Sequence, residues 1–143
     1  MTWGEIQISS LEKMFAKDEP IKVEDLDKLR QDDDCKWYLS AMPAVCNEAI
    51  ERIKPYVQNM YEYDEEDKSY RKTTVEHVSA DTPDEEEIAL TEDACVLIPL
   101  YIASQLYKDD DISQATAYRN EFEVGLQDLI YNVENQETIK EVY

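Results

Sequence analysis

Between Thr91 and Tyr131 the sequence has two consecutive helix patterns joined by an acidic turn. The first begins at Thr91, a favourable N-cap residue, and its run from Ala94 to Ala103, ACVLIPLYIA, is apolar almost all round. A helix without a polar face belongs in the interior, so this one is predicted to lie in the middle of the core. Pro99 has no N–H for the carbonyl of Cys95, which predicts a kink there. The apolar run is far shorter than the roughly 20 residues that cross a bilayer.

The second pattern follows the turn at Asp109–Asp111. Asp111 with Gln114 three residues later, or Ser113 alone, predicts the N-terminus of a helix. Residues of one face then recur at a helical period, at Ala115, Tyr118, Phe122, Gly125 and Leu129. Glycine inside a helix costs up to about 1 kcal/mol relative to alanine, and we expect Gly125 to allow close approach of the preceding helix. Together the two patterns predict a C-terminal helical hairpin.

Three further segments carry helix signals. Thr2 and Glu5 form a capping box before a helix to about Lys17. Its predicted inward residues are Trp3, Ile6, Leu11, Met14 and Phe15. Val23–Leu29 predicts a short helix or turn. From Cys35 to about Ile53 the pattern is amphipathic, and Pro43 either kinks this helix or begins a new one. The prediction is one mainly α domain over residues 1–143, a compact bundle of about four to five helices built on the C-terminal hairpin.

Two stretches lack a clear helical period. Residues 56–88 are predicted to be an irregular acidic connection, with a short strand or extended loop within Tyr70–Val78. Tyrosine provides a large contact area at small entropic cost, so the tyrosines of this connection are candidate partner-binding residues: Tyr61, Tyr63 and Tyr70. The polar tail at 132–143 is predicted to be frayed and flexible, or to become ordered on a neighbouring protein through its last apolar residues, Ile139, Val142 and Tyr143.

The charge of the chain restricts its partners. The sequence has 34 acidic and 14 basic residues and a formal net charge of −20. Such a surface repels phosphate, which argues against nucleic-acid binding by the domain and favours a basic partner. The same field opposes the packing of copies against one another unless an interface neutralises it. Between Thr73 and Tyr107 the sequence has no Lys or Arg, so one edge of the molecule is predicted to be strongly negative.

The sequence lacks the signatures of an active centre. The acidic groups at Asp64–Asp67 and Asp109–Asp111 do not have EF-hand spacing and are interpreted as solvated turns, so no metal site is predicted. The single histidine, His77, has no Glu three residues before it, and two glycines leave no phosphate-binding loop. The cysteines Cys35, Cys46 and Cys95 are predicted to be buried free thiols. No cofactor, signal peptide or enzymatic activity is predicted, and the chain is expected to stay in the cytoplasm.

Two segments also resemble a known family. LIPLYIASQLYKDDDISQATAYRNEFEVGLQDL combines an apolar helix containing proline, an acidic turn and a second helix. Its matching residues are Pro99, Tyr101, Ile102, Ala103, Leu106, Asp109 to Asp111, Tyr118, Asn120, Glu121, Phe122 and Glu123. WYLSAMPAVCNEAIERI, earlier in the chain, combines Tyr-Leu, Met-Pro and Asn-Glu-Ala. In this order the segments resemble the first core helix and the C-terminal hairpin of the head–tail connector (adaptor, or neck) proteins of tailed bacteriophages and prophages. Some relatives have an inserted β-domain where this chain has residues 56–88, which are too few for one, so the chain is similar to a minimal version.

The resemblance implies a structural, non-enzymatic protein of the virion neck, assembled in the cytoplasm of a bacterial host. Such a protein would form a ring of about twelve copies below the portal and join capsid to tail around the DNA channel, without specific DNA binding. Its partners would be copies of itself, the portal protein and other neck or tail-completion proteins, with Arg119 and Glu123 as further candidate contact residues. The alternative, which rests on charge alone, is an acidic DNA mimic that inhibits a basic nucleic-acid-binding protein.

Overall fold

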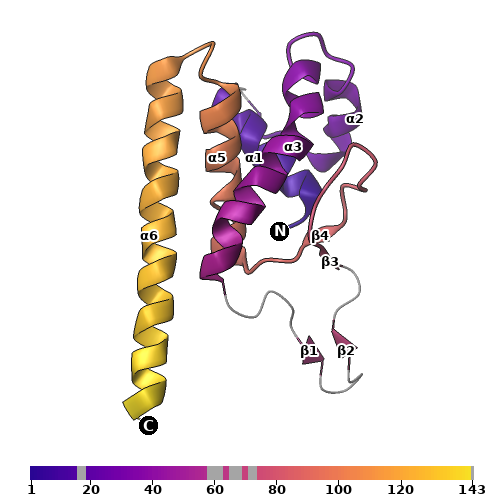
Figure 1. Ribbon diagram of the computed structural model, residues 1–143. Coiled ribbons are helices and arrows are strands. Elements are labelled where there is room, and N and C mark those ends of the chain that lie inside the picture. Colours follow the sequence, from indigo (N-terminus) through magenta and orange to yellow (C-terminus); the bar gives the residue numbers. More distant parts are fainter. Residues whose placement is uncertain (16–18, 58–62, 65–68, 71–73, 143) are drawn as a thin grey trace.

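The computed structural model describes residues 1–15, 19–57, 63–64, 69–70 and 74–142, and it gives the backbone alone for 63–64, 69–70, 74 and 132–142. The protein is mainly helical, as predicted. Helix α5 (Ile98–Leu106) contacts α1 (Trp3–Met14), α3 (Lys36–Ile53) and α6 (Ile112–Val142), and Figure 1 shows it between them. Because the sequence of α5 is apolar on nearly every side, each neighbouring helix covers part of its surface.

Helix α1 begins with the predicted capping box. Thr2 Oγ1 accepts a hydrogen bond from the Glu5 N–H at 3.1 Å, and Glu5 Oε1 accepts one from the Thr2 N–H at 3.1 Å. These bonds satisfy N–H groups that the start of a helix leaves without partners. The helix ends at Met14, earlier than predicted, and Phe15 takes an extended conformation and packs edge-on against Tyr38.

The second helical segment is short and the third is long. The 3-10 turn η1 (Val23–Asp25) leads into α2 (Leu26–Leu29), as predicted for this stretch. Helix α3 continues through Pro43, so the alternative in which this proline begins a new helix is wrong. Helix α3 buries one side, which includes Met42 and Cys46, and ends in the 3-10 turn η2 (Lys54–Tyr56).

The helix predicted from Thr91 onward is interrupted instead of kinked. Helix α4 (Glu92–Cys95) ends after a single turn, and α5 begins at Ile98 with Pro99 in its first turn. The physical reason is the one behind the predicted kink, since proline offers no N–H to the carbonyl of Cys95 and its ring crowds that carbonyl. In the first turn of a new helix neither the missing N–H nor the bulk of the ring is unfavourable, because N–H groups there have no partner within the helix and no preceding helical turn lies against the ring.

Helices α5 and α6 form the predicted hairpin (Figure 1). The Asp111 carboxylate caps α6 by accepting a hydrogen bond from the Gln114 N–H at 3.0 Å. A Cβ atom at Gly125 would lie 2.3 Å from Leu97 Cδ2, so the predicted close approach at this glycine is confirmed. Figure 1 shows α6 extending well beyond the end of α5, and its backbone is helical to Val142, through most of the segment predicted to be a frayed tail.

The connection between α3 and α4 contains short strands, in agreement with the predicted irregular segment. Strand β1 (Tyr63–Asp64) pairs antiparallel with β2 (Ser69–Tyr70). Strand β3 (Thr74–Val75) pairs parallel with β4 (Glu87–Ile88). On the side away from β3, Glu87 of β4 forms an isolated antiparallel bridge with Thr2, so the start of the chain pairs with the edge of this small sheet.

Backbone hydrogen bonds also join the acidic loop before β4 to the first turn of α1. The Trp3 N–H donates to the Glu86 carbonyl, and the Gly4 N–H donates to the Asp84 carbonyl, both at 2.8 Å. A Cβ atom at Gly4 would lie 3.0 Å from that Asp84 oxygen, so a residue without a side chain allows this approach. The loop therefore lies against α1, although the two are distant in sequence.

One continuous hydrophobic core joins these elements. Its fully buried side chains include Ile6 and Leu11 of α1, Met42 of α3, Ile102 of α5 and Phe122 of α6. The three cysteines are buried and form no disulfide, as predicted. The hairpin thus shares its interior with α1 and α3, and the remaining face of α6 points to solvent.

Candidate functional site

Two of the predicted contact residues lie together where α6 meets α3 and α5. Arg119 Nε donates a hydrogen bond to Glu123 Oε1 at 3.0 Å, one turn further along α6. Arg52 Nη1, near the end of α3, lies 3.7 Å from the same oxygen. One carboxylate is therefore shared by two guanidinium groups from different helices, and this cluster carries a net positive charge on an acidic protein.

The ring of Tyr101 in α5 lies between the two arginines. The guanidinium carbons of Arg52 and Arg119 are 5.6 Å and 5.7 Å from its centroid, within the range of cation–π attraction. Tyr101 is buried and packs against Phe122, with the ring centroids 5.1 Å apart. Half-exposed pairs of this kind contribute about 0.5–1 kcal/mol each, so the cluster chiefly orients α6 against α3 and α5. The contributions of Arg52 and Tyr101 could not be read from the sequence, because they come from other elements.

The outward face of α6 carries a stripe of exposed residues without charge. Its members follow one another at intervals of three or four residues, the spacing of a single helix face: Ser113, Ala117, Asn120, Val124, Gln127 and Tyr131. We call this set the α6 stripe. Val124 is 62% exposed and Tyr131 is 63% exposed, so two large apolar groups face solvent within it. The same spacing continues in the sequence at Asn135, Thr138 and Val142.

The helical period that the sequence shows marks the inward residues of this helix, so the α6 stripe on the outward side was missed. In the structure Glu123 turns toward Arg52 and Arg119 and does not belong to the stripe. The available signal was that charged residues avoid every position of the stripe, although 34% of the chain is charged.

The other predicted contact residues are placed only in part. Tyr63 and Tyr70 are register partners in the β1–β2 hairpin, so the fold brings their backbones together. Ile139 and Val142 lie in the last turns of α6, where the backbone alone is described. Tyr61 and Tyr143 lie outside the described residues.

His77 and the acidic group at Asp109–Asp111 contact other side chains, whereas of the acidic group at Asp64–Asp67 only Asp64 lies within the described residues. Among the described residues, no three His, Cys, Asp or Glu side chains are gathered so that they could hold a metal ion. His77 Nε2 lies 2.7 Å from Glu51 Oε1, and both side chains are about half exposed. In the turn before α6, Asp111 caps the helix and Asp110 accepts a hydrogen bond from the Tyr38 hydroxyl. Asp109–Asp111 is therefore a solvated capping turn, as the sequence indicated.

Within the described part of the chain, no helix combines the length and the apolar character that crossing a bilayer requires. Comparisons of the chain with protein-family models, with curated proteins and with solved structures found no match.

Proposed function

We propose that this protein is a structural component of the neck of a tailed phage or prophage, a head–tail connector that forms a ring below the portal and joins capsid to tail. The proposal is supported by the residues that resemble that family, from Pro99 to Glu123, and by the helical hairpin in which they lie. The protein would act through its surfaces and would bind copies of itself, the portal and other neck proteins.

The observation that carries the proposal is the α6 stripe. Two copies with a net charge of −20 repel each other, and a contact through charged faces would place acidic side chains of both copies side by side. A contact through the stripe would avoid this repulsion between acidic side chains, because its six described members are uncharged. It also shares two features with interface cores, since it has no charged residue and it includes a tyrosine, a residue type enriched there.

The length of α6 is compatible with a ring. The helix extends beyond α5, so its C-terminal part is free to reach a neighbouring copy (Figure 1). A contact between the stripe and a different surface of the next copy is heterologous, and heterologous contacts close into rings when the rotation is suitable. An acidic ring would repel the phosphates of the genome, which would pass through the channel without adhering.

The direct test is to mix the purified protein with the portal protein encoded in the same genome and to examine the mixture by electron microscopy. We expect rings attached to the portal. Alone, the protein is expected to be monomeric, because self-repulsion opposes assembly. A chain that stays monomeric beside the portal would contradict the proposal. Capture of a basic nucleic-acid-binding protein from a host lysate, with an affinity that falls steeply with salt, would instead support the acidic DNA mimic.

A matched pair of variants tests the role of the stripe. Val124→Glu places a negative charge in the middle of the stripe and is expected to abolish rings while leaving the helical content unchanged. Ala44→Glu adds the same charge to an exposed position of α3 and should assemble as the wild type does. If the Val124 variant forms rings as well as the Ala44 variant, the stripe is not the contact between copies.

A further inference from the structure

A pocket of about 230 Å³ lies where α1, the end of α2, the first turns of α3 and the Ser79–Ala80 loop meet. Leu39 and Pro43 supply apolar wall, and Trp3, Arg30 and Lys36 supply hydrogen-bond donors. The pocket is larger than the engineered cavities of about 150 Å³ that admit benzene. It could therefore accommodate one large side chain or a small organic molecule.

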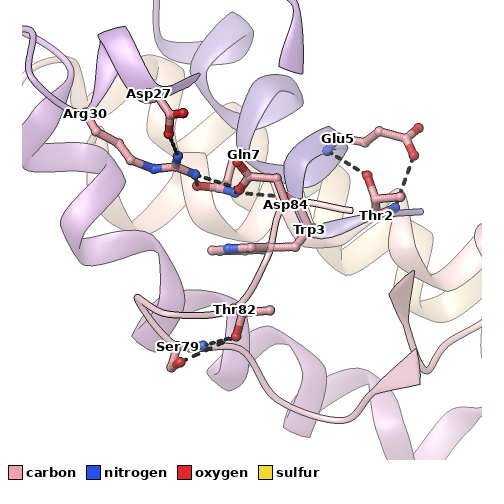
Figure 2. A network of polar contacts seen from close by, with 9 residues as sticks. All are labelled: Thr2, Trp3, Glu5, Gln7, Asp27, Arg30, Ser79, Thr82 and Asp84. Atoms are coloured by element: carbon pink, nitrogen blue, oxygen red, sulfur yellow. Dashed lines mark hydrogen bonds and ion pairs between the residues drawn. The ribbon is translucent and has the colours of Figure 1, made fainter. Parts of the chain in front are cut away.

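A network of charged hydrogen bonds holds one wall of this pocket in place (Figure 2). Arg30 Nη2 donates to Asp84 Oδ1 at 2.6 Å and to Gln7 Oε1 at 3.3 Å. Gln7 Nε2 donates to the same Asp84 oxygen at 2.8 Å and to the Trp3 carbonyl at 3.3 Å. These bonds connect α1, the residue after α2 and the acidic loop, so the wall is formed before any ligand arrives.

Trp3 provides a donor that is unpaired among the residues the structure describes. Its side chain is only 2% exposed, yet the indole N–H makes no hydrogen bond to any residue that the structure describes. No side-chain nitrogen in the described part of the chain is both fully enclosed and unpaired, so this N–H keeps some accessible surface, and Trp3 is one of the residues that line the pocket. Figure 2 shows the ring between the Arg30–Gln7–Asp84 network and the Ser79–Thr82 turn. Because a buried indole N–H usually has a partner, this N–H is available to an acceptor on a ligand of the pocket.

Lys36 supplies a second donor, with a positive charge. Its ammonium group lies 2.9 Å from Asp33 Oδ1, but the Asp33 side chain is 92% exposed. Such surface pairs contribute about 0–1 kcal/mol, so Lys36 can exchange this partner for a better-placed anion at little cost. Arg30 is held by Asp27 and Asp84 and stays in the wall.

We propose that this pocket binds a carboxylate carried on an apolar group. The indole N–H of Trp3 and the ammonium group of Lys36 would both donate to the carboxylate, and Leu39 and Pro43 would contact the apolar part. A charge-assisted bond of this kind is roughly twice as strong as a neutral one, which offsets the repulsion of an anion by the acidic protein. The carboxylate could belong to a free organic acid or to an acidic side chain of a partner protein. This inference does not depend on the neck assignment.

The two tryptophans of the chain make the test direct, because the indole region of a ¹⁵N–¹H NMR spectrum contains one signal from Trp3 and one from Trp37. The Trp37→Phe variant identifies each signal. On titration with phenylacetate, we expect the Trp3 signal to move until it saturates, while the signal of Trp37, which is 76% exposed, stays in place. Phenylacetamide, which lacks the charge, should bind more weakly. No saturable shift of Trp3, or equal binding of the amide, would overturn the proposal.

Lysine variants separate a specific contact from general charge. Lys36→Met should weaken phenylacetate binding about tenfold, the effect of losing one hydrogen bond to a charged group. Lys28→Met removes the same charge from an exposed position of α2 and should leave the affinity unchanged. Equal losses in both variants would contradict a role for Lys36.

The blocked peptide acetyl-Leu-Glu-Leu-amide distinguishes the two possible sources of the carboxylate. Tighter binding than phenylacetate indicates an acidic side chain of a partner protein, and weaker binding indicates a free organic acid.

Discussion

The thiol of Cys46 has no accessible surface, and burial is the main reason why its pKa is raised to about 12. The neighbouring thiol of Cys95 raises it further. Burial likewise raises the pKa of Cys95 to about 11. Both side chains are therefore neutral at physiological pH and act as small apolar groups of the core, and neither has the low pKa of a reactive cysteine.

These raised pKa values predict a loss of stability in alkali. A thiol in the unfolded chain loses its proton near pH 8.5, whereas in the folded protein it keeps the proton to a much higher pH. Above that point the unfolded state binds fewer protons than the native state, so the free energy of unfolding falls as pH rises toward the folded pKa values. The slope is up to about 1.4 kcal/mol per pH unit for each thiol. Urea unfolding between about pH 8 and pH 10 should show a shallower fall for Cys46→Ala than for the wild type. An equally steep fall of the free energy of unfolding in both proteins would show that the raised pKa of Cys46 does not contribute.

At the scale of elements, the packing of α6 depends on Gly125. A Cβ atom at this position would lie 2.3 Å from Leu97 Cδ2, and Leu97 is buried directly before α5. An added methyl group must therefore displace Leu97, and overpacking of this kind costs about 1–3 kcal/mol. The higher helix propensity of alanine stabilises the helix by at most about 1 kcal/mol, which only partly offsets this cost.

We predict that Gly125→Ala lowers the free energy of unfolding by about 1 kcal/mol in the wild type. In a Leu97→Ala background the side chain that blocks the added methyl group is gone, and Gly125→Ala should raise the free energy of unfolding by up to about 1 kcal/mol. Urea unfolding of the four proteins measures both effects, and Ala117→Gly on the exposed face of α6 calibrates helix propensity alone. The same effect of Gly125→Ala in both backgrounds would show that Leu97 does not limit the approach.

For the whole molecule, the dominant electrostatic property is its excess of negative charge. Self-repulsion at a net charge of −20 destabilises the compact state, and salt screens that repulsion over about 10 Å at 0.1 M. We predict that the melting temperature, followed by circular dichroism at neutral pH, rises when sodium chloride is increased from about 20 mM to about 500 mM. Near the isoelectric point of about 4.2 the net charge vanishes, and the same addition should have much less effect. A melting temperature independent of salt at neutral pH would mean that the charges are already compensated locally.

The main helices were predictable because their signals are local. The capping box of α1, the amphipathic period of α3 and the apolar run of α5 each lie within one stretch of chain, and the structure confirms all three. The close approach at Gly125 was also predictable, since a glycine that weakens a helix suggests a packing reason. The missing N–H of Pro99 predicted where the helix would be irregular. Whether the helix kinks or breaks there depends on how the chain packs on both sides of the proline.

The candidate functional features required the tertiary structure. The Arg52–Tyr101–Arg119–Glu123 cluster draws on three helices, and the pocket beside Trp3 is built from α1, α2, α3 and a distant loop. The exposure of Trp37, on a helix whose other aromatic residue is half-buried, also depends on which face the core covers. By itself the sequence determined where helices form and that the surface is acidic, because backbone capping, side-chain period and charge are properties of neighbouring residues. Which distant side chains meet was decided by packing, because contacts between separate elements have no fixed spacing along the chain.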